Sequence, residues 1–167
     1  MIDFKNKLVP LIETSRAIET VTQIAAFKDV VGLFFGAADA SASLGCKLAW
    51  EPLLYARQRV VLAASMFNLF TIDAPYFYID KMAGLKEEAE KVKNLGFTGK
   101  AAIHPDQIDH INEAFSPSAE EKEEAKKVLE EYQKSGGGAI KVDGQMIDEP
   151  IAEAMRLKIT LGEEEKD

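Results

Sequence analysis

Short apolar runs alternate with segments of helical periodicity along the chain up to about residue 115. The apolar runs at 8–12, 30–36, 70–72 and 100–103 predict four strands. The segments between them carry apolar residues three and four positions apart, which predicts helices over 15–27, 51–67 and 83–95. A strand–helix–strand crossover makes consecutive strands parallel. The pattern therefore predicts an α/β fold with a parallel sheet.

The rest of the chain has a different pattern. A short helix is predicted over 106–114, and a strongly charged helix capped by Ser118 is predicted over 119–135. Three glycines at 136–138 then interrupt the chain, and Asp143–Gly144 between two short apolar runs predicts a β-hairpin. A last helix is predicted over 151–161. We therefore expect a first domain over 1–135 and a C-terminal hairpin and helix over 136–167.

Two carboxylates follow neighbouring strands of this predicted sheet. The run at 8–12 leads into Glu13, and the run at 30–36 leads into Asp39, after which the small residues 40–45 predict a loop. The carboxyl ends of parallel strands meet at one edge of a sheet, where α/β proteins place their active sites. Two acids there can bind Mg²⁺, which takes oxygen ligands. Alternatively, each acid is an ordinary loop residue or a charge at a helix start, with Thr14 as the helix cap.

The composition narrows the class of protein. The chain has 167 residues, of which 47% are hydrophobic, which is enough for one domain with a real core. A net charge of −8 disfavours nucleic acid as a partner. No apolar run approaches the about 20 residues of a membrane span, and residues 1–7 do not resemble a signal peptide. The single cysteine, Cys46, excludes an internal disulfide, so we expect a cytoplasmic protein.

Six segments in order resemble one known family and cover nearly the whole chain. The segments are LVPLIETSRAI, VVGLFFGAADASASLG, LLYARQRVVLAAS, TIDAPY, LGFTGKAAIHPDQIDHINEAFSPS and GGGAIKVDGQMIDEP. Together they resemble the C-terminal part of the citrate lyase beta subunit family, also called the HpcH/HpaI aldolase and citrate lyase group, to which malyl-CoA lyases belong. The resemblance implies a TIM barrel of β/α units.

The resemblance also implies roles for particular residues. The acid of the IET motif, Glu13, and the aspartate of the glycine-x-x-Asp motif, Asp39, would bind Mg²⁺. The aspartate of the MID-x-P motif, Asp148, would be the catalytic acid or base, supplied in related lyases by a neighbouring subunit. The local sequence alone also predicts that Asp148 is a helix N-cap, with Pro150 in the first turn of the helix.

Substrate and coenzyme A would bind near two further segments, according to the same resemblance. These are Ala38, beside the metal aspartate, and Ile103–His104 at the end of the fourth predicted strand. His104 also has a purely structural interpretation as a residue at a strand end. The implied reaction is a Mg²⁺-dependent retro-Claisen cleavage of citryl-CoA to acetyl-CoA and oxaloacetate. The alternatives are a malyl-CoA-type lyase or aldolase, and a truncated, non-catalytic module that binds metal and coenzyme A.

The chain departs from the family in its length. A (β/α)₈ barrel typically needs about 250 residues, so we expect only the last four β/α units, a half barrel, plus the C-terminal hairpin and helix. The family carries a substrate-binding arginine in a motif of its N-terminal half. None of the arginines of this chain matches that motif, neither Arg16 nor Arg57, Arg59 or Arg156. We therefore expect this chain alone to be weakly active or inactive. We also expect a homo-oligomer or pairing with a separate N-terminal half, because a half barrel leaves open sheet edges.

Overall fold

The computed structural model describes residues 7–136 and 138–161. The chain forms two compact units, residues 1–115 and 116–167, and each is considered by itself. This division differs from the expected boundary at 135/136. The physical reason is that helix α7 (Ala119–Lys134) packs against helix α8 (Glu149–Leu161) and strand β5 (Ile140–Val142), and so belongs to the C-terminal unit.

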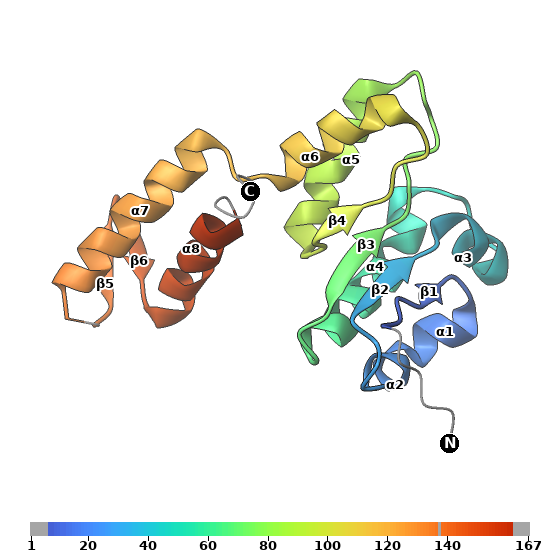
Figure 1. Cartoon of the computed structure of the whole chain (residues 1–167), viewed down its shortest axis with the longest axis horizontal. Helices are drawn as coiled ribbons and strands as arrows, with labels where there is room; N and C mark the ends of the chain where they lie inside the picture. The colour runs from blue at the N-terminus through green and yellow to red at the C-terminus, as the bar shows by residue number, and fades with distance from the viewer. Residues whose placement is uncertain (1–6, 137, 162–167) are drawn as a thin grey trace. The chain divides into compact units, whose positions relative to one another are not determined.

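The first unit is built on a parallel sheet, as the sequence pattern predicts (Figure 1). Its strands are β1 (Leu11–Ile12), β2 (Gly32–Phe35), β3 (Phe70–Asp73) and β4 (Gly99–Lys100), paired in the order β1-β2-β3-β4. Strands β1, β2 and β4 are shorter than their apolar runs, whereas β3 extends one residue beyond its run, to Asp73. Leu8, for example, makes only an isolated parallel bridge to Val30.

Helices connect these strands, with two differences from the sequence prediction. The segment 15–27 forms two short helices, α1 (Ser15–Glu19) and α2 (Val21–Ala25), because Thr20 leaves helical geometry and its hydroxyl donates to the Arg16 carbonyl at 2.8 Å. The small residues expected to form a loop at 40–45 instead belong to helix α3 (Ala37–Leu44). This helix ends at Gly45, whose φ of 67° lies in the left-handed region that glycine favours.

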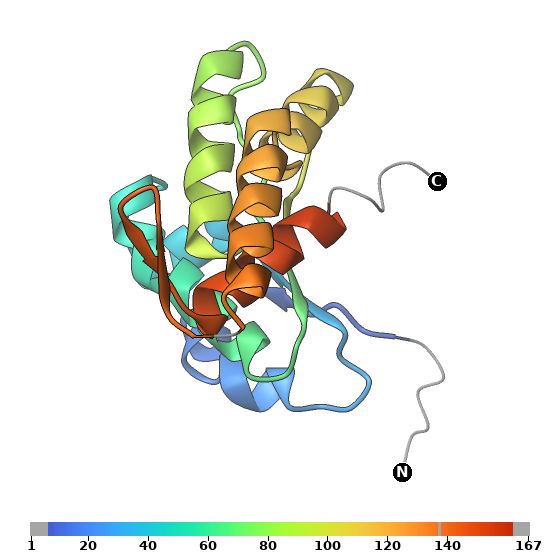
Figure 2. The ribbon, with the colours of Figure 1, turned by 90° about the vertical axis from the view of Figure 1, so that its left-hand side faces the viewer.

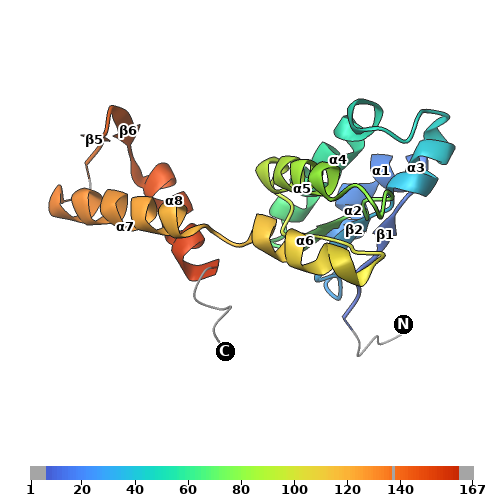
Figure 3. The same cartoon turned by 90° about the horizontal axis from the view of Figure 1, so that it is seen from above.

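Longer helices complete the first unit. These are α4 (Trp50–Ser65), α5 (Met82–Leu95) and α6 (Ile108–Phe115), the last preceded by the short 3₁₀ helix η1 (Pro105–Gln107). Helix α4 contacts β2 and β3. Helices α5 and α6 lie side by side (Figure 3). No helix in the described part of the chain is long and apolar enough to cross a membrane.

The two faces of the sheet are covered to different extents. The register places Ile12 beside Phe35, and both are fully buried in the main core. The adjacent positions on the opposite face are more open: Leu11 is 45% exposed and Phe70 is 40% exposed. Side chains alternate between faces along a strand, so one face packs on helices while the other presents apolar side chains to solvent.

The second unit consists of α7, a hairpin and α8, with α8 crossing α7 (Figure 2). The hairpin pairs β5 with β6 (Gln145–Ile147) in antiparallel register, which confirms the turn predicted at Asp143–Gly144. Both turn residues have positive φ, 48° and 91°, as hairpin turns of this length require. A small core holds the unit together and consists of Val128, Tyr132, Val142, Ile147 and Ala152.

Candidate active site

Glu13 lies directly after β1, at the carboxyl edge of the sheet. Thr14 caps helix α1 by accepting a hydrogen bond from the Ala17 amide at 3.1 Å. The Glu13 carboxylate is therefore not used as the helix cap. The Glu13 side chain is half-buried against Gly36, where an added Cβ would stand 2.8 Å from Glu13 Oε2. Glycine at position 36 therefore provides the room in which the Glu13 carboxylate sits.

Asp39 lies in the first turn of α3 and is exposed. Gly36, the residue against which Glu13 rests, is the N-cap of the same helix. A further contact ties the two segments together, since the Ser15 amide donates to Ser43 Oγ at 2.9 Å. The structure thus brings Glu13 to the turn that carries Asp39, and both carboxylates lie at the carboxyl ends of the paired strands β1 and β2.

The donor set at this edge is suited to a hard cation. Across residues 7–136 and 138–161, no group of three or more His, Cys, Asp or Glu side chains is arranged to hold a metal ion. A site built on Glu13 and Asp39 therefore offers two carboxylates and leaves the other positions to water or substrate. Mg²⁺ is usually bound in this way, so these residues fit Mg²⁺ and do not fit a structural zinc site, which needs four protein ligands.

Ala38, Ile103 and His104 also lie after strands of the same sheet. Ala38 is exposed in the first turn of α3, next to Asp39. Ile103 is 49% exposed in the loop after β4, and its amide donates to Gln107 Oε1 at 2.9 Å. His104 caps η1, with Nδ1 accepting from the Asp106 amide at 3.3 Å. The structural interpretation of His104 is therefore realised, and its ring is still partly open to solvent.

Asp148 belongs to the C-terminal unit, between β6 and α8. Its Oδ1 accepts from the Ile151 amide at 3.3 Å and its carbonyl accepts from the Ala152 amide at 2.9 Å. These contacts are those of a helix N-cap, the alternative that the local sequence offers. The long side-chain hydrogen bond and the half-buried position leave the carboxylate accessible for another role.

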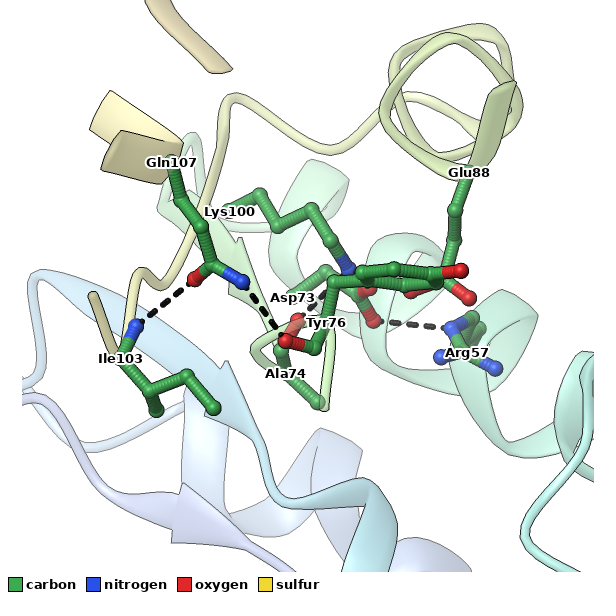
Figure 4. A network of polar contacts seen from close by, with 8 residues as sticks. All are labelled: Arg57, Asp73, Ala74, Tyr76, Glu88, Lys100, Ile103 and Gln107. Atoms are coloured by element: carbon green, nitrogen blue, oxygen red, sulfur yellow. Dashed lines mark hydrogen bonds and ion pairs between the residues drawn. The ribbon is translucent and has the colours of Figure 1, made fainter. Parts of the chain in front are cut away.

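A buried charge network, which the sequence pattern did not predict, lies at the carboxyl end of β3 (Figure 4). Asp73 at the end of β3 is fully buried and accepts from Arg57 Nε and from Lys100 Nζ, each at 2.8 Å. Lys100 Nζ also donates to the Ala74 carbonyl and to Glu88, each at 2.7 Å. The two cations and two carboxylates balance, as buried charges require.

Aromatic rings surround one side of this network. The Arg57 guanidinium lies 5.2 Å from the centre of the Phe35 ring and 4.8 Å from that of Trp50, which are cation–π distances. Burial raises the pKa of the Tyr76 hydroxyl above its ordinary value, and the nearby charge of Glu88 adds to this effect. Tyr76 therefore stays a neutral phenol over the physiological pH range.

One signal in the sequence could have revealed Arg57. It stands among Leu53, Val60 and Ala64, which are buried and spaced along one face of α4. A charged residue within such an apolar stripe needs a buried partner. That partner, Asp73, becomes identifiable only when the strand register is known, since it lies opposite Lys100 in the sheet.

Known proteins resemble this chain in sequence and in fold. A family described as HpcH/HpaI aldolase/citrate lyase matches residues 4–105. Citramalyl-CoA lyase, mitochondrial, from Homo sapiens is 36% identical over 170 residues, which cover 92% of this chain and 49% of that protein. Citrate lyase subunit beta from Haemophilus influenzae is 33% identical, with 90% of this chain and 54% of that protein covered. The chain spans about half the length of the curated relatives it matches.

Solved structures have a similar fold. Protein CitE from Mycobacterium tuberculosis, in complex with magnesium, acetoacetate and coenzyme A, superimposes with a TM-score of 0.87 at 31% identity. The match covers 96% of this chain and 62% of CitE. The parallel sheet and the acids at its carboxyl edge define an α/β protein with a candidate metal site. The chain belongs to the HpcH/HpaI aldolase/citrate lyase family, which confirms the resemblance seen in its sequence.

Proposed function

We propose that this chain is the metal- and substrate-binding part of a Mg²⁺-dependent carbon–carbon lyase of the citrate lyase beta subunit type. Its substrate would be citryl-CoA and its products acetyl-CoA and oxaloacetate. The observation that carries the proposal is the placement of the Glu13 carboxylate against Gly36, one helical turn before Asp39. Further support comes from the relatives, which are named as lyases, and from CitE, which was crystallised with magnesium and coenzyme A.

Glu13 and Asp39 would hold the metal and orient it toward the substrate. A bound Mg²⁺ supplies Lewis-acid stabilisation of negative charge on the substrate oxygens. Because Asp39 is exposed on α3 and Glu13 is half-buried, the site opens toward solvent and can admit a large thioester substrate.

Asp148 would transfer the proton to or from the carbon next to the thioester. In the cleavage direction, the substrate hydroxyl would give its proton to a solvent water as the carbon–carbon bond breaks, and the electron pair of that bond would pass to the carbon next to the thioester. The Asp148 carboxyl group then gives a proton to that carbon, which releases acetyl-CoA. In the condensing direction the Asp148 carboxylate removes the same proton. The family resemblance assigns this aspartate to the site of a neighbouring subunit.

Ala38, Ile103 and His104 would line the substrate path. The Ile103 amide is already bonded to Gln107, so the contribution of Ile103 would come from its exposed side chain. An apolar side chain of this kind suits the pantetheine arm of coenzyme A. The nitrogen of His104 that does not cap η1 would be available to a polar group of the substrate.

Two alternatives remain, and a specific observation favours the second. A malyl-CoA-type lyase or aldolase would use the same metal site on a different hydroxyacyl group. A non-catalytic module that binds metal and coenzyme A is favoured by the environment of the arginines. Arg57 is bonded to Asp73, Arg59 to the Glu19 carbonyl, and Arg156 to Glu149.

A turnover assay separates these possibilities. Citryl-CoA and malyl-CoA are each incubated with the chain and Mg²⁺, and the oxo-acid product is measured. We expect Mg²⁺-dependent cleavage of citryl-CoA well below the about 10 s⁻¹ typical of enzymes, and a further loss of about 10²-fold or more in Asp148→Asn. Asp109→Asn, an exposed aspartate on α6, is the matched control. Mg²⁺ binding without any product from either thioester would overturn the lyase proposal in favour of the binding module.

We also propose that the sheet is half of a β/α barrel and that a second copy of this chain covers its open side. Within the described residues, β1 and β4 each pair on one side only, and the less covered face carries exposed apolar side chains such as Leu11 and Phe70. Two copies related by a two-fold axis along the strands would place β4 of each beside β1 of the other in parallel. Sedimentation should then show a dimer at micromolar concentration. A monomer would overturn self-association and favour a complementary half as the partner.

A further inference from the structure

Gln107 is a fully buried polar side chain with both ends of its carboxamide occupied. Its Oε1 accepts from the Ile103 amide at 2.9 Å, and its Nε2 donates to the Tyr76 carbonyl, also at 2.9 Å (Figure 4). The side chain is 0% exposed. A buried glutamine whose donor and acceptor are both used links two backbone segments, and breaking either hydrogen bond would leave a buried polar group unpaired.

These two segments are loops at the carboxyl edge of the sheet. Tyr76 lies in the loop after β3, and Ile103 lies in the loop after β4. The backbone amide of Gln107 also donates to the His104 carbonyl at 3.0 Å, which closes η1. The backbone between 103 and 107 is therefore held at both ends by one residue.

A second set of contacts fixes the base of the same loop. The Ala101 amide donates to the Asp73 carbonyl at 2.9 Å, and the buried Lys100 side chain is bonded to Asp73 and to the Ala74 carbonyl. The base of the loop is thus anchored by charge, whereas its outer part depends on Gln107. Removal of the glutamine contacts should free the outer part and leave β4 in place.

We propose that Gln107 is a positioning residue, which holds the Ile103–His104 loop against the loop after β3 in the conformation that receives the coenzyme A substrate. The inference rests on the proposed function for the identity of that substrate. The positioning of the loop itself rests only on the contacts of Gln107.

The variant Gln107→Glu tests this role most sharply, because it keeps the shape of the side chain. In its charged form, the introduced carboxylate cannot donate to the Tyr76 carbonyl, and repulsion from that carbonyl together with the cost of burying the charge should displace it from the Ile103 amide as well. In its protonated form, the introduced carboxyl group could do both. Burial raises the pKa of a carboxyl group, so Gln107→Glu should lose the contact with Tyr76 at high pH and recover it at lower pH.

The experiment measures two quantities at about pH 8 and about pH 5.5, because burial raises the pKa of the introduced carboxyl group. The first is the hydrogen-exchange protection factor of the Ile103 amide, and the second is the dissociation constant for acetyl-CoA. The variants are Gln107→Glu and the control Gln23→Glu, which adds the same charge at an exposed position on α2. Other groups near the loop also carry charge or titrate, namely His104, Asp106, Lys100, Asp73 and Glu88, so the wild-type protein is measured under both conditions.

At the higher pH, Gln107→Glu should lose about tenfold in Ile103 protection and bind acetyl-CoA about tenfold more weakly, the change expected for one buried hydrogen bond. At the lower pH both values should return toward those of the wild type. Gln23→Glu should follow the wild type throughout. A residue with a purely structural role would change the midpoint of global unfolding, followed by Trp50 fluorescence, and would leave the dissociation constant for acetyl-CoA unchanged at both pH values.

The outcomes separate the positioning role from the proposed function. Unchanged Ile103 protection in Gln107→Glu, or a loss that does not recover at lower pH, overturns the positioning role. If Gln107→Glu does not fold, the wild-type protein still tests the inference, because an unprotected Ile103 backbone amide or Gln107 carboxamide would overturn it. If the wild-type chain does not bind acetyl-CoA, the proposed function fails, while the protection factors still decide whether Gln107 holds the loop.

Discussion

Replacing Asp73 with asparagine should destabilise the first unit strongly. The substitution keeps the shape of the side chain but removes its charge, which leaves Arg57 and the fully buried Lys100 with Glu88 as the remaining carboxylate. The charge network changes from neutral to a net charge of +1. A buried cation without a full partner is expensive because neither water nor a counter-charge solvates it.

The size of the effect follows from the two charged contacts of Asp73, of which an asparagine Oδ1 can keep only one, as a hydrogen bond to a neutral acceptor. Asp73 accepts one charged hydrogen bond from Arg57 and one from Lys100, each at 2.8 Å. Hydrogen bonds to charged groups contribute about 1.5–3 kcal/mol each, and breaking a buried ion pair typically costs about 3–5 kcal/mol. We therefore expect Asp73→Asn to lower the free energy of unfolding by about 4 kcal/mol.

Urea unfolding followed by tryptophan fluorescence measures this change. Trp50 is the single tryptophan of the chain and packs on Arg57, so its signal reports the first unit. With a denaturant slope of about 2 kcal/mol per molar, the midpoint should fall by about 2 M. Glu113→Gln, which breaks the exposed ion pair with Lys86, is the control and should shift the midpoint far less. Equal shifts for the two variants would refute the reasoning.

Three further variants test other parts of the structure. Gly36→Ala would place a methyl group 2.8 Å from Glu13 Oε2 and should weaken Mg²⁺ binding about tenfold by calorimetry; unchanged affinity would mean that Glu13 is not a ligand. Ser118→Ala removes the capping box at the start of α7 and should cost the second unit about 1 kcal/mol in circular dichroism melts, with Trp50 fluorescence unchanged. The hydrogen bond from Lys91 lowers the pKa of Glu87 below 4.5. The stabilisation by this pair is therefore present above the unfolded pKa and lost as the pH falls through the folded pKa, so wild type and Glu87→Gln should differ in stability at neutral pH and converge in acid.

The fold could be predicted where local patterns determine it. Alternating apolar runs and helical stretches predict the parallel sheet, and Asp143–Gly144 predicts the hairpin. Each of these signals is contained in a short stretch of consecutive residues. Helix α3 could not be found in this way. Its buried residues are small, for example Ala37, Ala40 and Ser41, so its amphipathic signal is weak and its small side chains read as a loop.

The charge network illustrates a different limit. Asp73 and Lys100 are 27 residues apart, and they meet only because β3 and β4 pair in one particular register. Gln107 and Tyr76 are 31 residues apart and meet through loops that no local pattern describes. In contrast, Glu13 and Asp39 could be assigned to one edge from the chain order alone, since Glu13 directly follows β1, Asp39 lies in the first turn of the helix that follows β2, and the two strands are neighbours.

The most direct test of the account is a double-mutant cycle for Mg²⁺ binding by calorimetry. We predict that Glu13→Gln and Asp39→Asn each weaken Mg²⁺ binding about tenfold or more, and that the double variant loses less than the sum of the two losses, because both carboxylates hold one ion. Glu90→Gln, an exposed glutamate on α5, should bind as the wild type does. Wild-type affinity in either single variant, or fully additive losses, would contradict a shared metal site at the carboxyl edge of the sheet.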